Sequence, residues 1–252
     1  MLYLIDLEPV ETRYTAQWKQ YLPEQLRNAG IDTTVIPGGH VPQVVTPGAF
    51  LNFAGTNNYK SQQMLRISQL FANGTIKDGD YFLYTDAWNP TVIQLKYMAE
   101  LLGIKIKIGG MWHAGSYDPQ DFLGRLIGDT PWVRNAEASM FHCFDHNFFA
   151  TKFHVDMFTN IFGNLSKETI KIVGWPMEYL KETLQPYNYI EKKSKIIFPH
   201  RLAPEKQLEI FKDLAASMPE YEWFVAQEHA LSKNEYHHHL AESKLVFSAN
   251  LQ

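Results

Sequence analysis

Two basic side chains, Arg201 and Lys206, stand in the segment FPHRLAPEKQ at residues 198–207. The segment follows the apolar run KIIFP and precedes a stretch with helical periodicity, which predicts a strand, a loop and a helix start. Ligands of wound parallel sheets gather at the carboxyl ends of the strands, and a helix N-terminus there favours an anion. Two cations at such a place suit a diphosphate. A solvated basic turn is the alternative for this decapeptide taken alone.

Short apolar runs alternate with helical segments before and after that loop, and this alternation predicts an α/β fold with a parallel sheet covered on both faces. In the first part of the chain we expect strands at 2–7, 33–37, 81–85, 104–109, 140–144 and 169–174. We expect helices over 12–28 and 59–73, from Pro90, Asp121 and Pro131, and over 147–160. The Gly- and Pro-punctuated stretch 37–58 predicts a long functional loop.

The segment GWPMEYLKETLQPYNYIEKKSK breaks this rhythm with proline, charge and tyrosine, as a crossover between domains does. Strands at 195–199, 222–226 and 244–249, with helices at 205–217 and 233–241, then begin a second series. We therefore expect a first lobe at 1–175, a crossover at 176–194 and a second lobe at 195–252. Three parallel strands would leave apolar surface uncovered, so this lobe is expected to be incomplete, with further residues beyond 252.

The loop resembles the signature G-R-L-x-x-E-K-G of retaining GT-B glycosyltransferases of the glycogen synthase-like group, also called family 4-like. Arg201, Leu202, Glu205 and Lys206 match in register, whereas His200 and Gln207 replace the two glycines. Two further segments resemble the same group: KIVGWPMEYL, like the strand and crossover that introduce the second domain, and AESKLVFSANLQ, like the stretch before the donor-binding helix. The resemblance implies two Rossmann-like, doubly wound lobes.

The resemblance also implies roles. Arg201 and Lys206 would hold the donor diphosphate and stabilise the charge that develops on it. His113, in the loop MWHAGSYDP, would contact the sugar near the reacting carbon as a catalytic residue; an ordinary loop histidine is the alternative. Neither a metal nor an organic cofactor is implied, and the configuration of the sugar would be retained. The family's pair of acidic residues, with seven residues between them, would fall beyond Gln252, so weaker donor affinity is expected without them.

The first lobe would supply the acceptor site. Gly38 and Gly39 in the loop at 37–58 could admit a ligand close to the backbone, with Asn57 and Asn58 as further wall candidates. A loose surface turn is the alternative. Asp86, like Asn89, follows the run YFLYT and is expected at the ligand edge of the sheet, although both side chains could instead cap the helix that Pro90 starts.

Other patterns point away from metal or dinucleotide chemistry. The polar cluster at 142–146 lies on an expected strand, which sends neighbouring side chains to opposite faces, and the three consecutive histidines at 237–239 diverge on a helix. The sequence has no G-x-G-x-x-G, no P-loop and no G-x-S-x-G motif.

Composition bounds the setting. The net charge of -4 gives no general excess of positive charge for a nucleic-acid backbone. The single cysteine, Cys143, forms no internal disulfide, and the start of the chain resembles neither a signal peptide nor a membrane span, which predicts a cytoplasmic protein.

These observations favour a glycosyltransferase that moves a sugar from a nucleotide-diphosphate donor to a hydroxyl acceptor. The acceptor could be a sugar, a lipid, a protein or a modified DNA base, and the charge does not favour a nucleic acid. Two alternatives stay open: a non-catalytic, truncated GT-B binding module and a nucleotide-sugar epimerase.

Overall fold

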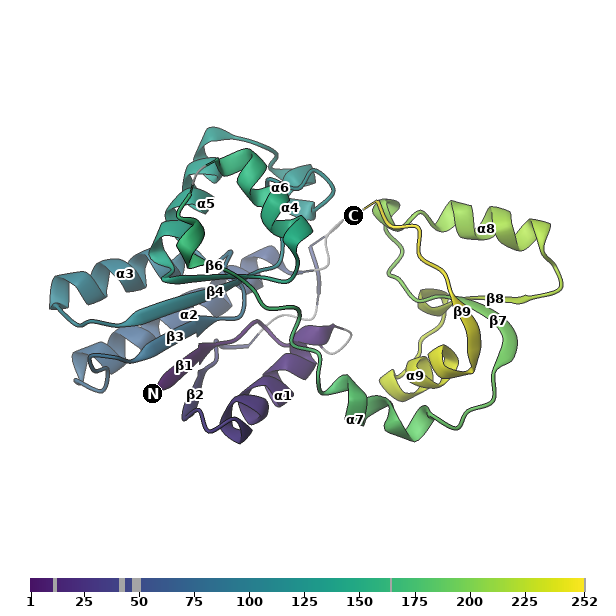
Figure 1. Cartoon of the computed structure of the whole chain (residues 1–252), viewed down its shortest axis with the longest axis horizontal. Helices are drawn as coiled ribbons and strands as arrows, with labels where there is room; N and C mark the ends of the chain where they lie inside the picture. Colours follow the sequence, from purple (N-terminus) through teal and green to yellow (C-terminus); the bar gives the residue numbers. More distant parts are fainter. Residues whose placement is uncertain (11–12, 41–43, 47–50, 164, 252) are drawn as a thin grey trace. The chain divides into compact units, whose positions relative to one another are not determined.

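The computed structural model describes residues 1–10, 13–40, 44–46, 51–163 and 165–251. The chain divides into two compact units, Met1–Pro176 and Met177–Gln252, each built on one parallel sheet (Figure 1). The segment expected as a crossover contains a short helix and a 3-10 turn, α7 (Leu180–Leu184) and η2 (Gln185–Tyr187), both within the second unit.

The described residues of the first unit form six parallel strands in the order β2-β1-β3-β4-β5-β6. Its strands are β1 (Leu2–Ile5), β2 (Thr33–Ile36), β3 (Tyr81–Tyr84), β4 (Lys107–Trp112), β5 (His146–Phe149) and β6 (Ile170–Ile172). Its helices are α1 (Tyr14–Asn28), α2 (Phe53–Ala72), α3 (Thr91–Leu102), α4 (Phe122–Leu126), α5 (Pro131–Cys143) and α6 (Lys152–Phe162), and the turn η1 (Lys167–Thr169) precedes β6.

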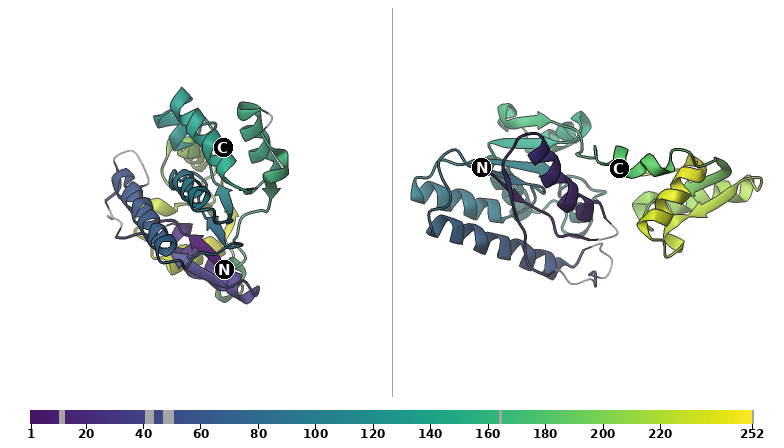
Figure 2. Two further views of the ribbon diagram at one scale, coloured as in Figure 1. Left: turned by 90° about the vertical axis from the view of Figure 1, so that its left-hand side faces the viewer. Right: turned by 90° about the horizontal axis from the view of Figure 1, so that it is seen from below.

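The first sheet is wound in two directions. The connection β1–α1–β2 runs one way along the sheet, and the later connections run the other way. Because such crossovers are right-handed, α1 lies on one face and the later helices on the opposite face, as the views in Figure 2 allow the reader to follow. Ring contacts agree, since Trp112 of β4 meets both Phe141 of α5 and Phe158 of α6. The main apolar core fills this second face.

The described residues of the second unit form three parallel strands in the order β8-β7-β9, and the helical connections β7–β8 and β8–β9 run in opposite directions along the sheet. Its elements are β7 (Lys193–Phe198), η3 (Pro204–Lys206), α8 (Leu208–Ser217), β8 (Glu222–Val225), η4 (Ala226–Glu228), α9 (Lys233–Glu242) and β9 (Ser243–Val246). An apolar core of Ile196, Phe198, Phe211 and Val225 lies on the α8 face. On the other face the side chain of Lys195 is almost fully buried and meets residues of α9.

Three of the elements expected in the first unit differ from the structure. Residues 140–144 are not a strand, because Val133, Glu137, Met140 and Phe141 are buried with the spacing of a helix, and they form one face of α5. The helix expected from Asn147 begins at Lys152, since residues 146–149 form β5. The loop expected at 37–58 ends earlier, because α2 already begins at Phe53. The α/β class itself, with doubly wound parallel sheets, is confirmed.

None of the helices in the described residues combines the length and the apolar character that crossing a membrane requires.

Candidate functional site

Each sheet has one point at which the winding direction reverses, and ligands of such folds bind outside the strand ends there. In the first unit this point lies between β1 and β3, and in the second unit between β7 and β9. The residues that follow these strands are therefore the main candidates for ligand binding and catalysis.

Two buried carboxylates follow β1. The side chain of Asp6 accepts hydrogen bonds from the Tyr59 hydroxyl at 2.8 Å and the Gln63 amide at 2.9 Å, and it lies 3.7 Å from the Lys19 ammonium. Burial raises the pKa of Asp6 to about 6, although hydrogen bonds from Tyr59 and Gln63 and the charge of Lys19 oppose this shift. Glu8, at 2% exposure, accepts a short hydrogen bond from the Thr56 hydroxyl.

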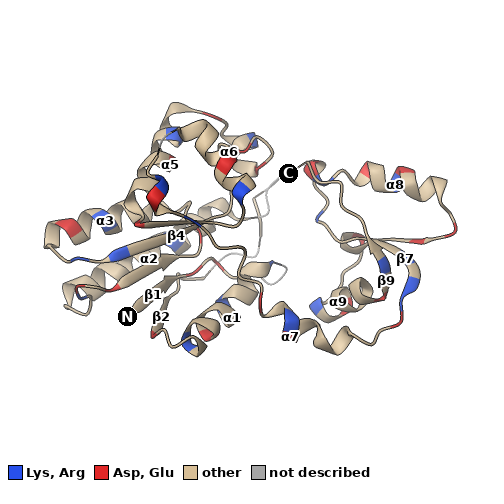
Figure 3. Ribbon diagram, viewed as in Figure 1, with Lys and Arg blue, Asp and Glu red and all other residues tan. Residues whose placement is uncertain are grey.

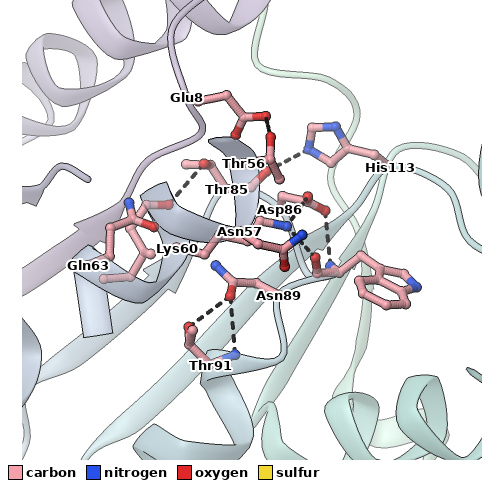
Figure 4. Close-up of polar contacts among 12 residues, drawn as sticks. Glu8, Thr56, Asn57, Lys60, Gln63, Thr85, Asp86, Asn89, Thr91 and His113 are labelled. Atoms are coloured by element: carbon pink, nitrogen blue, oxygen red, sulfur yellow. Dashed lines mark hydrogen bonds and ion pairs between the residues drawn. The ribbon is translucent and has the colours of Figure 1, made fainter. Parts of the chain in front are cut away.

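Helix α2 supplies the partners of both carboxylates. Thr56, Tyr59 and Gln63 lie at positions i, i+3 and i+7, which places them on one face of the helix. The Asn52 side chain caps the helix by accepting a hydrogen bond from the Gly55 amide at 2.7 Å. A helix with a defined start thus presents three polar side chains to the carboxylates after β1. Figure 4 shows two of them, Thr56 and Gln63, together with Glu8.

The residues after β3 form a second polar group. The Asp86 carboxylate accepts a hydrogen bond from the Trp88 amide at 3.0 Å and lies 3.5 Å from the Lys60 ammonium, which also donates to the Trp88 carbonyl oxygen at 2.7 Å. Asn89 instead accepts from the amide and hydroxyl of Thr91 at the start of α3. Asn89 thus holds the first residue of α3, although the N-cap itself is Pro90 and has no side-chain cap, whereas Asp86 holds its own turn and faces Lys60 (Figure 4).

His113 follows β4 and has both ring nitrogens occupied. Nε2 lies 2.6 Å from the Thr85 carbonyl oxygen, which can only accept a hydrogen bond, so Nε2 carries the proton. Nδ1 therefore accepts from the Tyr14 hydroxyl, also at 2.6 Å. Burial lowers the pKa of His113, although the charge of Asp86 and the Thr85 bond oppose this. The imidazole is thus neutral, and a sugar can reach a ring nitrogen only if Tyr14 or Thr85 gives up its bond.

Aromatic rings enclose the His113 side chain. Tyr14, Trp18 and Trp175 all have ring centroids within 6 Å of the imidazole, the nearest being Trp175 at 4.6 Å. Trp18 belongs to α1, and Trp175 lies at the end of the first unit. The position of His113 therefore depends on α1 and on the segment that leaves this unit.

Glu137 of α5 fixes the loop that continues from His113. This fully buried side chain accepts hydrogen bonds from the amide and hydroxyl of Ser116, both at 2.7 Å, and from the Trp88 indole at 2.8 Å. A Cβ at Gly115 would lie 2.7 Å from the carboxylate and 2.3 Å from the Tyr117 ring, so only glycine fits there. One carboxylate thus ties the turn after β3 to the loop after β4.

The predicted acceptor residues fall into separate places. Gly38 and Gly39 lie against α2, where a Cβ would come within 2.3 Å of the Tyr59 ring and 2.0 Å of the Gln62 side chain, so the close approach that they permit is to the protein's own helix. Asn57 and Asn58 are exposed on the first turns of α2, and the Asn57 amide donates to the Phe53 carbonyl oxygen of the same helix. Residues 41–43 and 47–50 of the expected loop lie outside the described residues.

Arg201 and Lys206 lie in the loop after β7, at the winding reversal of the second sheet. The Arg201 guanidinium, 40% exposed, pairs with the buried Glu205 carboxylate. Within the described part of the chain, the half-buried Lys206 ammonium has no hydrogen-bond partner. Burial lowers the pKa of Lys206, Glu205 partly raises it, and Arg201 lowers it further. A bound anion would relieve this destabilisation of the Lys206 cation.

The start of α8 differs from the expected one. The helix was expected from Glu205, but Pro204–Lys206 form a 3-10 turn and α8 begins at Leu208. Gln207 between them has φ 52° and ψ 52°, in the left-handed region, and it is the one non-glycine residue with positive φ among the residues described. Glycine takes this conformation without strain. A glycine would therefore suit the position after Lys206 better than glutamine does.

Replacing Gln207 with glycine is expected to raise the free energy of unfolding of the second unit by about 1 kcal/mol, since the left-handed strain disappears. Urea denaturation, with hydrogen exchange of the β7 amides to follow this unit, measures the change. Gln207→Ala serves as the control and should give no gain, because alanine keeps the strain. A lower stability for the glycine variant would contradict the explanation.

The charges of both units are mixed. Lys and Arg alternate with Asp and Glu along the ribbon (Figure 3). Among the described residues, no three His, Cys, Asp or Glu side chains are grouped so that they could hold a metal ion.

No protein-family model matches the chain, and no curated protein matches it. Among solved structures, the crystal structure of Glycyrrhiza uralensis UGT73P12, a UDP-glycosyltransferase complexed with glycyrrhetinic acid 3-O-monoglucuronide, is similar over 98% of this chain and 68% of that chain. The identity is 10% and the TM-score is 0.50. The chain has a GT-B fold. At this level of sequence identity, the similarity between the two chains supports a common fold and does not by itself assign an activity.

Sequence reasoning missed the buried polar groups of the first unit: Asp6, Glu8, Tyr14, Thr56, Tyr59, Lys60, Gln63 and Glu137. A local signal existed for the first two, because D-x-E directly follows the apolar run LYLI, just as Asp86 follows YFLYT. The others become site residues only through contacts that are distant in sequence.

Proposed function

We propose that this GT-B chain is a glycosyltransferase that moves a sugar from a nucleotide-diphosphate donor to a hydroxyl acceptor. The observation that carries the proposal is the pair Arg201 and Lys206 in the loop after β7, at the winding reversal where ligands of such sheets bind. The similarity to a glycosyltransferase fold supports it.

The two basic side chains suit the leaving group. In the transfer, the bond between the anomeric carbon and the diphosphate oxygen breaks, and its electron pair stays on the diphosphate. The acceptor oxygen bonds to the anomeric carbon and gives its hydroxyl proton to a basic oxygen within reach. Arg201 and Lys206 would stabilise the charge that develops there, so that neither a metal nor an organic cofactor is needed. Retention of configuration is the course that the sequence resemblance implies.

The first unit would bind the acceptor. Its winding reversal carries buried carboxylates after β1 and the pair Lys60 and Asp86 after β3. His113 beside them would stay a neutral positioning group unless Tyr14 releases Nδ1. The acceptor classes that we retain are a sugar, a lipid, a protein and a modified DNA base, which present different scaffolds around one reactive hydroxyl.

Calorimetric titration of the full chain with UDP, ADP and GDP tests the donor half of the proposal. We expect saturable binding of one nucleoside diphosphate per chain. If none of the three binds, the proposal is wrong.

Transfer assays test the other half. The chain is incubated with UDP-glucose, ADP-glucose or GDP-mannose, and with methyl glucoside, octyl glucoside, a Ser- and Thr-containing peptide or an oligonucleotide with 5-hydroxymethylcytosine. We expect release of the nucleoside diphosphate together with a glycosylated product, and the anomeric coupling constant of that product reports retention. Binding without turnover would indicate a binding module, and a changed donor sugar without an acceptor would indicate an epimerase.

A further inference from the structure

Glu8 lies at the ligand edge of the first sheet. It stands three residues beyond the end of β1 and accepts a hydrogen bond from the Thr56 hydroxyl on Oε1 (Figure 4). Its side chain is 2% exposed. A carboxylate at this depth needs partners for both oxygens, because an unpaired buried polar atom destabilises the fold.

One oxygen of Glu8 has no such partner. Among the described residues nothing donates a hydrogen bond to Oε2, although the atom is shielded from solvent. Glu137 offers a comparison within the same unit, since this equally buried glutamate has both oxygens occupied by Ser116 and Trp88. The two glutamates thus differ: both oxygens of Glu137 are used to hold a loop, whereas one oxygen of Glu8 remains able to accept a hydrogen bond from a ligand.

Two other oxygen atoms near Glu8 are also buried and lack a hydrogen-bond donor in the described part of the chain. Oδ2 of Asp6 and Oε1 of Gln63 are also buried without a hydrogen bond from the described residues, although Lys19 lies 3.7 Å from Asp6. Three such oxygens at one sheet edge call for a ligand that donates hydrogen bonds. Two carboxylates also disfavour an anionic ligand, because like charges repel. A neutral ligand bearing hydroxyl groups satisfies both conditions.

Other cationic or polar groups at this edge are already engaged. The Lys60 ammonium donates to the Trp88 carbonyl oxygen and faces Asp86, and both ring nitrogens of His113 are bonded within the chain. Of the two carboxylates after β1, Asp6 forms an ion pair with Lys19, whereas Glu8 forms no ion pair with a cation among the described residues. Its oxygen is therefore the strongest acceptor left for a substrate hydroxyl.

We propose that Glu8 binds the reacting hydroxyl of the acceptor, which donates its hydrogen bond to Oε2 and comes from an uncharged part of the acceptor. The inference rests on the proposed sugar transfer and adds a residue to it. The hydrogen bond orients the acceptor oxygen and increases its electron density, and Oε2 takes the hydroxyl proton as the new glycosidic bond forms and the diphosphate leaves. Thr56 holds the carboxylate in place. Glu8 is thus a catalytic residue, and Thr56 is a positioning residue.

The test compares Glu8→Gln, Glu8→Met and Glu137→Gln in the full chain. Donor affinity is measured by titration with UDP, ADP and GDP, and turnover as release of nucleoside diphosphate from the matching sugar nucleotide, with water as the smallest hydroxyl. We expect kcat to fall about 10-fold for Glu8→Gln, whose amide oxygen is a weaker acceptor, and about 100-fold for Glu8→Met. The Kd of the diphosphate should stay within about twofold.

Thermal unfolding separates this role from a structural one. The Tm of both Glu8 variants should equal or exceed that of the wild type, because each variant removes a buried negative charge that no cation pairs with, whereas Glu137→Gln should lower it. A kcat within about threefold of the wild type for Glu8→Met, or a lowered Tm for the Glu8 variants, overturns the inference while leaving sugar transfer intact. If the wild type neither binds nor turns over a donor, the proposed function fails, and the inference falls with it.

Discussion

Replacing Lys206 with alanine is expected to weaken the binding of a nucleoside diphosphate about 30-fold, and the double variant Arg201→Ala/Lys206→Ala about 1,000-fold. Each side chain would contribute a hydrogen bond between charged groups. The Lys206 cation, destabilised by its surroundings in the free protein, gains most from an anion. Titration calorimetry with the diphosphate that the wild type binds measures both changes, and kcat should fall in the double variant because the leaving group loses its support.

Lys212 provides the matched control. It lies in α8 of the same unit, where its ammonium is 3.8 Å from Glu228 and both side chains are about half exposed. Lys212→Ala removes the same charge from the chain, and the expected change in Kd is less than about twofold. If Lys212→Ala weakened binding as much as Lys206→Ala, the effect would come from net charge, and the loop after β7 would not be the donor site.

Replacing Glu242 with glutamine is expected to lower the free energy of unfolding of the second unit by about 3 kcal/mol. Glu242 of α9 accepts hydrogen bonds from Lys195 at 2.7 Å and Lys193 at 2.6 Å. Lys195 is 1% exposed and lies 4.1 Å from the centre of the Phe224 ring, so the variant would leave a buried ammonium without its main counter-charge. Urea denaturation with hydrogen exchange of the β7 amides measures the loss.

Two further variants give this prediction its control. Glu228→Gln breaks the exposed pair with Lys212 and should cost less than about 0.5 kcal/mol. The double variant Lys195→Met/Glu242→Leu removes both buried charges and should recover most of the loss, because the desolvation of the ammonium disappears with it. A loss below about 1 kcal/mol for Glu242→Gln would show that the buried pair does not support the unit.

The same pair predicts a dependence on pH. Burial raises the pKa of Glu242, but the hydrogen bonds from Lys193 and Lys195 outweigh it and bring the pKa down to about 2, from an ordinary value of 4.5. Because the folded state holds the proton less tightly than the unfolded state, the stabilisation is complete above about pH 4.5 and is lost as the pH falls towards 2. Denaturation at several pH values should show this loss in the wild type and not in Glu242→Gln.

The alternation of apolar runs and helical stretches was enough to predict the α/β class. It also located the loop with Arg201 and Lys206, because a strand end followed by a helix start is a local pattern. The same rule was not applied to Asp6, since the first strand was expected to run to Leu7 and so to include this residue, whereas β1 ends at Ile5. The register of β5 was missed because Met140 and Phe141 fit an apolar strand as well as a helix face.

Other parts of the candidate site cannot be predicted from local sequence patterns. Thr56 is 48 residues from Glu8 in the sequence, and Tyr14 is 99 residues from His113. Nothing in the local pattern pairs them, because the sheet order brings them together. The tautomer of His113 depends on a carbonyl oxygen at the end of another strand, and the fit of Gly38 and Gly39 against α2 depends on a helix start that was expected six residues later.

The ring of Trp175 stands where the polypeptide exits the first unit, and it touches His113, Trp18 and Tyr14. The position of the His113 ring is therefore coupled by direct packing to the position of Trp175. A change of the chain path at Pro176 would alter the packing around His113 directly.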